Sequence, residues 1–345
     1  MAEHTAEGAA QDAPLISVVI AVYNGQDIVG QAISSVLRQT HPRVEVFVVD
    51  DGSQDRTREV LAGYEAVSRP DRVVRVLSQP NAGCGAARNT ALKEVSGDFV
   101  TFLDADDELL PHHLETLLDR YREVRANPGG ERTVVYANAW QCTPSGINAD
   151  RPVYRERMPG REEQRSVILE YNIGSLSGLF PRSFFDEVGV FDPEQVFVED
   201  WELWLRAVYS GWRFDRVEQV TSVLAWSGGS MQSQRDRMGA GEEMALRKTL
   251  ARFEKELSPE EREKLLRRLR NGSPLAAASN AEQAMREGRR EDARRHLQMA
   301  ARMMPSQRRV TLKARIAGLP GGMRWLESRQ RSVDASVGYT DAMRR

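Results

Sequence analysis

The stretch Phe99-Val-Thr-Phe-Leu-Asp-Ala-Asp-Asp107 decides the fold, because a run of apolar and β-branched residues ends there in three acids within four positions. The apolar run predicts a buried strand. Three carboxylates at one strand end repel each other unless a cation or hydrogen-bond donors compensate them. The spacing Asp104-x-Asp106 suits Mg²⁺ or Mn²⁺ carrying a diphosphate, since these ions prefer oxygen ligands. The alternative is a solvated turn whose acids cap a helix that begins near Pro111.

Size and composition are those of an ordinary globular protein. The chain has 345 residues, of which 41% are apolar and 28% charged, and this length allows two domains. No apolar run reaches the roughly 18 residues that a membrane span needs. Residues 1–13 are small and polar, so we expect a disordered lead-in and no signal peptide. Cys84 and Cys142 lack metal-ligand spacing and predict reduced thiols in a cytoplasmic protein.

Charge is divided unevenly along the chain. Residues 1–234 carry 22 Lys and Arg against 35 Asp and Glu, whereas residues 235–345 carry 26 against 15. This asymmetry predicts a boundary near residue 235 and a basic tail that meets something acidic. The acidic half of the chain itself, an anionic membrane at the inner face of the cell, and a lipid phosphate are the alternatives. Nucleic acid is not expected, since no RNA- or DNA-binding motif accompanies the arginines.

Strands and helices alternate in the first part of the chain. Apolar runs predict strands over residues 16–22, 44–49, 73–77 and 99–103, and helical periodicity predicts helices over residues 28–38, 55–66 and 86–95. Ser53 is the expected N-cap of the second helix. This alternation is typical of an α/β domain with a mainly parallel, Rossmann-like sheet flanked by helices.

Polar clusters follow three of these strands. They are Tyr23-Asn24, Asp50-Asp51 and the acids from Asp104 to Asp107. Parallel sheets bind ligands outside the carboxyl ends of their strands, so we expect these side chains to line one site.

Five motifs, in order and at fitting separations, together resemble family 2 glycosyltransferases with a GT-A fold, over roughly residues 14–235. The motifs are Ser17-Val-Val-Ile-Ala-Val-Tyr-Asn24, Val48-Val-Asp-Asp-Gly-Ser53, Asn81-Ala-Gly-Cys-Gly-Ala-Ala-Arg-Asn89, Asp104-Ala-Asp-Asp107 and Glu199-Asp-Trp-Glu-Leu-Trp-Leu-Arg206.

The resemblance implies a site for a nucleotide-sugar donor. Asp51, or its neighbour Asp50, would bind the base, and a carboxylate that accepts a uracil N–H suits uridine. Arg88 would lie near the diphosphate, which a guanidinium suits. The implied donor-binding set is Ala21, Tyr23, Asn24, Asp50, Asp51, Gly83, Arg88, Asp104 and Ala105.

The resemblance also implies a divalent metal, Mn²⁺ or Mg²⁺, as cofactor. Asp104 would address the ribose and share the metal site with Asp106, which would ligate the ion that bridges the two phosphates. Such a metal offsets the charge that develops on the leaving nucleoside diphosphate.

Glu199 and Asp200 open a helix predicted over residues 201–209. An acid at a helix start can simply satisfy free N–H groups and the helix dipole. The resemblance favours Asp200 as the general base that deprotonates an acceptor hydroxyl, with Glu199 and Trp201 on the acceptor side. Like-charge repulsion from Glu199 would raise the pKa of Asp200.

The sequence departs from the family pattern at several positions. Ala21 stands where proline is usual, and in residues 224–231 Ala225 and Ser227 replace a usual Arg and His. The missing His affects the expected metal affinity or donor choice. A Gln-x-x-Arg-Trp motif is also absent, which argues against a processive polysaccharide synthase.

The tail is helical in composition. Amphipathic helices are expected over residues 242–256 and 259–270, followed by a helical hairpin over residues 274–304. The predicted organisation is a lead-in (1–13), a GT-A domain (14–234), a basic all-helical extension (235–317) and a loose tail (318–345). The extension is either a solvated appendage or a surface for a membrane or partner.

The sequence thus predicts an inverting, metal-dependent, non-processive glycosyltransferase that moves a sugar from a UDP-sugar to an acceptor hydroxyl in cell-surface polysaccharide or glycoconjugate synthesis. One alternative is a nucleotide-sugar-binding protein without transfer activity. Another is a nucleotidyltransferase, although Tyr23-Asn24-Gly25 lacks the basic loop expected there.

Overall fold

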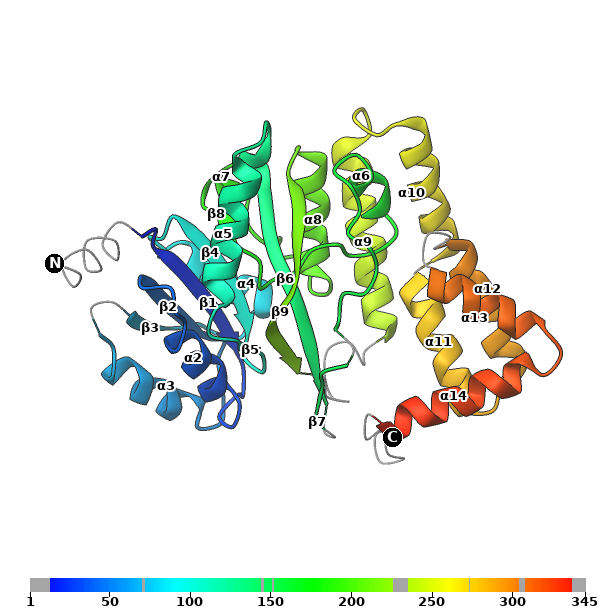
Figure 1. The fold of residues 1–345 in the computed structure, drawn as a ribbon, viewed down its shortest axis with the longest axis horizontal. Coiled ribbons are helices and arrows are strands. Elements are labelled where there is room, and N and C mark those ends of the chain that lie inside the picture. Colours follow the sequence, from blue (N-terminus) through cyan, green and yellow to red (C-terminus); the bar gives the residue numbers. More distant parts are fainter. Residues whose placement is uncertain are drawn as a thin grey trace.

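The N-terminal part of the computed structural model contains a five-stranded sheet (Figure 1). The structure describes residues 13–69, 72–143, 146–150, 152–225, 235–272, 274–303 and 308–336. The strand order is β3-β2-β1-β4-β8, with β8 antiparallel to β4 and the others parallel. The strands are β1 (Ile16–Val22), β2 (Val44–Asp50), β3 (Arg72–Ser78), β4 (Phe99–Asp104) and β8 (Phe180–Pro181). The four strands predicted from apolar runs are therefore confirmed.

Apolar side chains cover both faces of this sheet, as the continuous apolar runs require. On one face, Val18 and Ile20 pack in a core with α2 (Val29–Leu37), α3 (Thr57–Ala66) and α5 (His113–Arg125). On the other, Val19 and Phe102 pack with α4 (Cys84–Leu92), α7 (Ser183–Val188) and α8 (Glu199–Tyr209).

A second sheet stands beside the first and is built around two long strands (Figure 1). Its order is β5-β9-β6-β7, and the parallel pair of β6 and β9 is irregular around Asn138. The sequence did not predict β9, because its mixture of polar and apolar residues gives no clear period. The bounds are β5 (Glu108–Leu109), β6 (Thr133–Thr143), β7 (Gly146–Asn148) and β9 (Arg213–Ala225), with α6 (Gln164–Val167) and the 3₁₀ turn η1 (Gly130–Arg132) between them.

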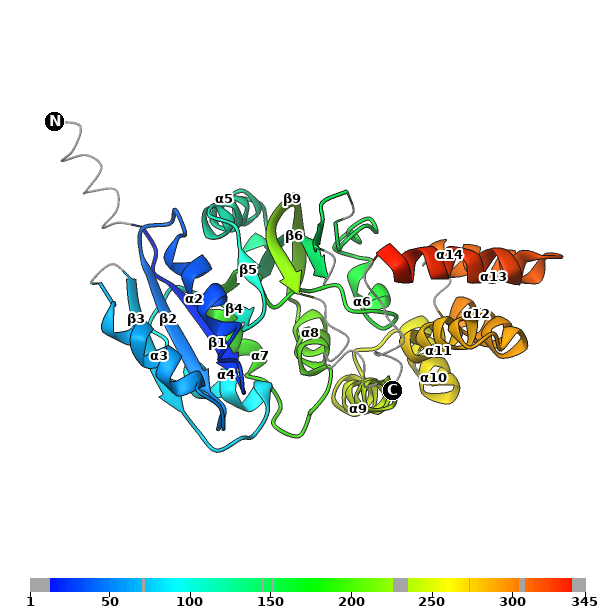
Figure 2. The ribbon, with the colours of Figure 1, turned by 90° about the horizontal axis from the view of Figure 1, so that it is seen from below.

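The described residues after 234 form six helices. Of these, α9 runs alongside α8 in both ribbon views (Figures 1 and 2). Ion pairs hold this extension to the acidic half: Lys248–Asp192 at 2.7 Å, Lys264–Glu170 at 2.6 Å and Glu261–Arg165 at 2.9 Å. Part of the excess basic charge therefore meets the acidic half itself. The helices are α9 (Arg235–Phe253), α10 (Pro259–Asn271), α11 (Pro274–Arg286), α12 (Arg290–Met303), α13 (Arg308–Gly318) and α14 (Gly322–Ser336).

Two local predictions are wrong. Ser53 does not cap α3, which begins after Arg56; its hydroxyl accepts the Asn24 N–H at 2.9 Å instead and ties two strand-end loops together. The segment from residue 318 is not loose over its described part, because α14 packs Met323 and Leu326 into a small core with α11, α12 and α13. The predicted lead-in, apart from its last residue, lies outside the described residues.

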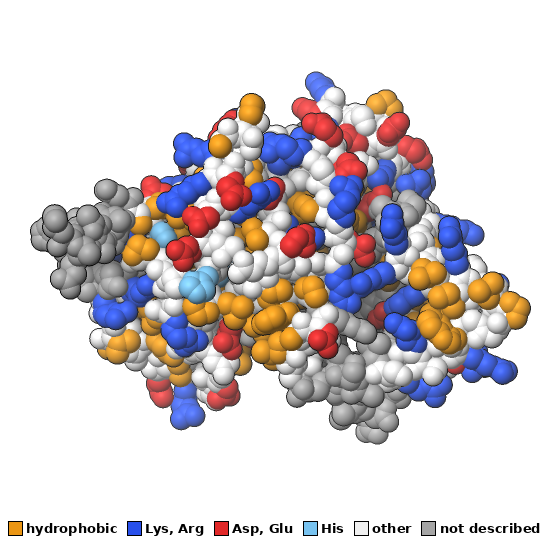
Figure 3. Space-filling view, viewed as in Figure 1, with side chains coloured by type: hydrophobic (Ala, Val, Ile, Leu, Met, Phe, Trp, Pro, Cys, Tyr) orange, Lys and Arg blue, Asp and Glu red, His pale blue; other side chains and the backbone are white. Residues whose placement is uncertain are grey.

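The described helices contain none that is long and apolar enough to cross a bilayer. Lys and Arg side chains are spread over the C-terminal helices on one face, beside apolar groups (Figure 3). Cys84 and Cys142 are free thiols, as predicted.

Candidate functional site

The strand-end residues meet at the carboxyl edge of the sheet. β1 lies between β2 and β4, so that Ala21 pairs in register with both Val49 and Asp104, and Val22 pairs with Asp50. The expected convergence of the three polar clusters is therefore present.

Asp51 anchors the loop that leads into α4. Its buried carboxylate accepts hydrogen bonds from Gln79 Nε2 at 2.7 Å and from the backbone N–H groups of Ala82 and Gly83, both at 2.9 Å. Gly83 has φ +91°, a conformation that favours glycine. The carboxylate thus fixes this loop backbone beside the predicted donor site.

Asp50 has a different set of partners, which hold the turn after β2. Its carboxylate accepts from the Ser53 N–H at 2.9 Å and from Arg58 Nε at 2.7 Å. Burial favours the neutral acid, but the hydrogen bonds from Arg58 and Ser53 outweigh it and lower the pKa of Asp50.

The other predicted donor contacts border this edge. Tyr23 is about half exposed, and Asn24 adopts φ +50° and accepts the Gln54 N–H on its side chain at 2.8 Å. Asn tolerates this left-handed conformation better than most residues. Ala105 is partly buried against the core beneath.

Arg88 is a buried cation that joins two of the predicted acids. Its Nη1 donates to Glu199 Oε1 at 2.7 Å and its Nη2 to Asp104 Oδ1 at 2.8 Å, while its side chain is only 4% exposed. Burial alone would lower the pKa of Arg88, but Asp104 and Glu199 raise it overall. Glu199 also accepts from the Cys84 thiol at 3.0 Å, and burial is the main cause that raises the pKa of that thiol to about 12.

The three acids after β4 differ in environment. Burial, followed by the Asp104 charge, raises the pKa of Asp106 and that of Asp107, the latter to about 9. The Asp107 carboxylate accepts the Ala225 N–H at 2.7 Å and so links this turn to β9.

A divalent cation fits the Asp104–Asp106 turn. Burial and then the Asp104 charge raise the pKa of Asp106, and a bound cation would offset that repulsion. The described residues hold no cluster of three or more Asp, Glu, His or Cys side chains with metal-binding geometry. One or two carboxylates plus substrate phosphates is the usual arrangement for Mg²⁺, so a metal here would depend on the donor for its other ligands. Ser227, which replaces the usual His, lies outside the described residues.

Asp200 lies in the first turn of α8, and a residue that the sequence did not single out holds it. Asn172 Nδ2 donates to Asp200 Oδ2 at 2.7 Å, and the Asn172 amide oxygen accepts the Gly174 N–H at 3.0 Å. Burial and then the charge of Glu199 raise the pKa of Asp200 to about 6. The direction matches the expected repulsion, although burial is the larger cause.

The residue before this helix start is strained. Val198 has φ +53°, which is a rare conformation for a β-branched side chain. Strain of this kind persists where surrounding contacts enforce it, and it often accompanies functional sites. The strained residue directly precedes Glu199 and Asp200.

Trp201 packs in the core rather than offering an open face. It is 3% exposed, and its indole N–H donates to the Ile168 carbonyl at 3.0 Å. Only a small part of the ring borders the cavity described next.

A cavity of about 250 Å³ brings the predicted residues together. Arg88, Asp104, Glu199, Asp200 and Trp201 line it, together with Asn172 and with Met238, Glu242 and Arg268 from the C-terminal helices. The sequence analysis did not predict that Asn172 or these helices contribute to the site, since no motif marks them.

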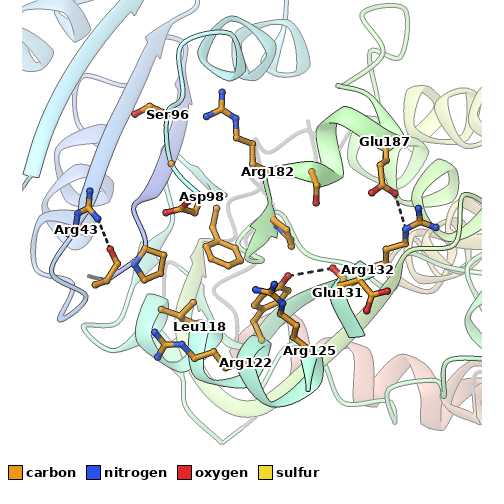
Figure 4. Close-up of a pocket in the computed structure, with 17 residues that line it drawn as sticks. Arg43, Ser96, Asp98, Leu118, Arg122, Arg125, Glu131, Arg132, Arg182 and Glu187 are labelled. Atoms are coloured by element: carbon orange, nitrogen blue, oxygen red, sulfur yellow. Dashed lines mark hydrogen bonds and ion pairs between the residues drawn. The ribbon is translucent and has the colours of Figure 1, made fainter. Parts of the chain in front are cut away.

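A larger depression of about 900 Å³ lies at the opposite, amino end of the strands (Figure 4). Arg43, Asp98, Arg122 and Arg182 are among the residues around it, and Arg132 pairs there with Glu187 at 3.0 Å. It contains none of the predicted site residues.

Comparison with known proteins agrees with this geometry. The family model described as Glycosyl transferase family 2 matches residues 17–185, which include the ends of β1, β2 and β4. Residues 17–185 therefore belong to family 2. Rickettsia proteins described as uncharacterized glycosyltransferases are 27 to 29% identical to this chain over 197 or 198 residues, and the match spans 27 to 58% of their lengths.

The chain is also similar to a further curated protein and to solved structures. The putative teichuronic acid biosynthesis glycosyltransferase TuaG of Bacillus subtilis is 41% identical over 106 residues, which is 31% of this chain and 41% of TuaG. Among solved structures, S. aureus TarS 1-349 in complex with UDP-GlcNAc has a TM-score of 0.59 at 18% identity, covering 93% of this chain and 91% of TarS. Mannosyltransferase PcManGT from Pyrobaculum calidifontis, in complex with GDP-Man and Mn²⁺, has a TM-score of 0.56 at 19% identity, covering 95% and 87%. The predicted GT-A fold with C-terminal helices is therefore confirmed.

Proposed function

We propose that this glycosyltransferase is an inverting, metal-dependent, non-processive enzyme that moves one sugar from a UDP-sugar to an acceptor hydroxyl. The observation that carries the proposal is the placement of Asp200, which shares one cavity with Arg88 and Asp104. A carboxylate with a raised pKa therefore lies beside the edge where the donor is expected.

The donor half of the proposal rests on the carboxyl edge of the sheet. Asp51 lies at the end of β2, and its hydrogen bonds order the loop around Gly83, as expected for a site that receives a nucleoside. The TarS complex with UDP-GlcNAc favours uridine, whereas the PcManGT complex holds GDP-Man, so the base has to be measured.

Asp104 and Asp106 would hold Mn²⁺ or Mg²⁺ against the diphosphate. When bound, the ion would supply Lewis-acid stabilisation of the leaving nucleoside diphosphate. Arg88 orients the Asp104 carboxylate through its 2.8 Å hydrogen bond.

Asp200 would accept the proton of the acceptor hydroxyl as that oxygen attacks the anomeric carbon. Inversion requires attack from the face opposite the leaving diphosphate, so the base must lie across the sugar from the donor phosphates. With a pKa of about 6, Asp200 is largely ionised at pH 7 and still basic enough to assist proton transfer. The acceptor would be a sugar of a cell-surface polysaccharide or glycoconjugate, in keeping with the name of TuaG.

Calorimetric titration tests the donor site: UDP, GDP, CDP and dTDP are compared with and without Mn²⁺. Preference for UDP that depends on Mn²⁺ supports the proposal. Preference for another nucleotide corrects the donor, and no binding at all refutes it.

The Asp200→Asn variant tests the base. We expect unchanged UDP affinity and a loss of transfer of about 10² to 10⁴-fold, the usual contribution of a general base. Release of UDP identifies sugar transfer, whereas release of pyrophosphate would identify a nucleotidyltransferase. Retained transfer in the variant would remove Asp200 from the mechanism.

A further inference from the structure

Two helices outside the segment matched by the family model complete the cavity that holds Asp200. Met238 and Glu242 come from α9 and Arg268 comes from α10, and all three line this cavity with Asp200. Figure 2 shows α9 beside α8, the helix whose first turn contains Asp200, and α10 next to α9.

Glu242 and Arg268 form a buried ion pair at this wall. Arg268 Nη2 lies 3.0 Å from Glu242 Oε2, and both side chains are 2% exposed. Such a pair is rarely more stabilising than apolar residues of the same volume, because both charges lose their hydration. Stability alone is therefore a poor reason for its presence.

Arg268 is fixed in place with one donor left over. Its Nη1 donates to the Glu170 carbonyl at 2.7 Å, and its guanidinium carbon lies 5.4 Å from the centre of the Trp201 ring. Its buried Nε–H has no acceptor among the described residues. An unmet buried donor is costly, and an oxygen of a bound ligand would satisfy it.

The charges around the cavity indicate which ligand fits. Its carboxylates outnumber its two guanidinium groups, and Lys264 adds one ammonium against Glu170 from outside. An acceptor that carried a negative charge would be repelled by Asp200, at a cost that rises in a buried site. The lining acids are Asp104, Glu170, Glu199, Asp200 and Glu242.

We propose that Arg268 and Glu242 bind the acceptor, and that the cavity takes an uncharged sugar ring. A sugar hydroxyl both donates and accepts, so it pairs with a carboxylate oxygen and with a guanidinium N–H at once. The volume of about 250 Å³ equals that of roughly eight water molecules, which suits one ring rather than a longer segment. This inference rests on the proposed function and assigns the acceptor subsite to the helical extension.

The double variant Arg268→Met/Glu242→Met tests this inference, because it removes both charges together and leaves neither buried alone. The probes are methyl glycosides of glucose, galactose, N-acetylglucosamine and rhamnose, with methyl glucuronide as the anionic counterpart. We expect the acceptor KM to rise at least tenfold, with UDP affinity and the rate of donor hydrolysis by water unchanged. The wild type should use the neutral glycoside at least tenfold better than the glucuronide.

The matched control is Arg165→Met/Glu261→Met. It removes another ion pair between the extension and the catalytic half, at 2.9 Å, that does not line this cavity. A similar rise of KM in the control, or an unchanged KM in the test variant, would overturn the inference. If the wild type used the glucuronide as well as the neutral glycosides, the inference that the acceptor sugar is uncharged would be overturned.

Calorimetric binding of the neutral glycosides without donor separates this inference from the proposed function. Binding to the wild type that the double variant loses supports the subsite even if no sugar is transferred. Transfer by both proteins with equal glycoside affinity leaves the proposed function intact and refutes the subsite.

Discussion

Asn172 offers a direct test of how the proposed base is tuned. Its side-chain amide donates to Asp200 at 2.7 Å and thereby favours the ionised carboxylate. Replacing Asn172 with Leu removes this donor at similar size. A hydrogen bond to a charged group contributes about 1.5–3 kcal/mol, and one pKa unit corresponds to about 1.4 kcal/mol.

The pKa of Asp200 should therefore rise from about 6 to between about 7 and 8 in Asn172→Leu. At pH 7 the ionised fraction would fall about fourfold, for a shift of about 1.5 units, and at pH 9 it would recover. The assay is the pH profile of kcat/KM for sugar transfer, whose acidic limb reports the base of the free enzyme.

Asn172 also accepts the Gly174 N–H, so the variant should lose about 1 kcal/mol of stability, which thermal unfolding measures. Tyr171→Phe is the control, since Tyr171 lines the same cavity and has no described bond to Asp200. An acidic limb that stays near pH 6 in Asn172→Leu would refute the reasoning. Equal loss of activity at every pH would instead assign Asn172 a purely structural role.

Two further changes test the metal site and a buried histidine. Asp106→Asn should weaken UDP binding at least tenfold in Mn²⁺ and leave metal-free binding unchanged. The control is Asp119→Asn at an exposed position, which should change neither affinity. Equal calorimetric affinities of the wild type and both variants would remove Asp106 from the metal site. His113 is buried between the Thr221 hydroxyl and the Ser177 carbonyl, and burial lowers its pKa to about 4. The neutral form of His113 therefore stabilises the fold above pH 6.5, and this stability is lost as the pH falls towards 4. Between pH 6.5 and 4, the free energy of unfolding measured in urea should fall by about 3 kcal/mol less in His113→Gln than in the wild type. Equal pH dependence of this free energy in both proteins would contradict the role of His113.

The strands and the acids that follow them could be predicted from the sequence. A continuous apolar run such as that of β4 specifies a strand buried on both faces, and alternation with helices specifies a parallel sheet. Because the carboxyl ends of parallel strands lie at one edge of the sheet, the sequence alone could predict that Asp50 and Asp104 lie at the same edge.

Partners far apart in the sequence could not be predicted in the same way. Arg88 was expected near a diphosphate, but its partners are Asp104 and Glu199, the latter 111 residues away. Serine is a common helix N-cap, yet the Ser53 hydroxyl instead accepts a hydrogen bond from the Asn24 N–H. β9 escaped prediction because its neighbours in the second sheet, rather than a period in its own sequence, make it a strand.

The sequence by itself thus determined the sheet, its functional edge and the candidate acids, because these depend on local periodicity and on the order of strands. Only the tertiary structure decided that Asn172 holds Asp200 and that α9 and α10 wall its cavity. Those contacts depend on how separate elements pack, and hydrogen bonds between distant side chains leave no period or spacing in the chain.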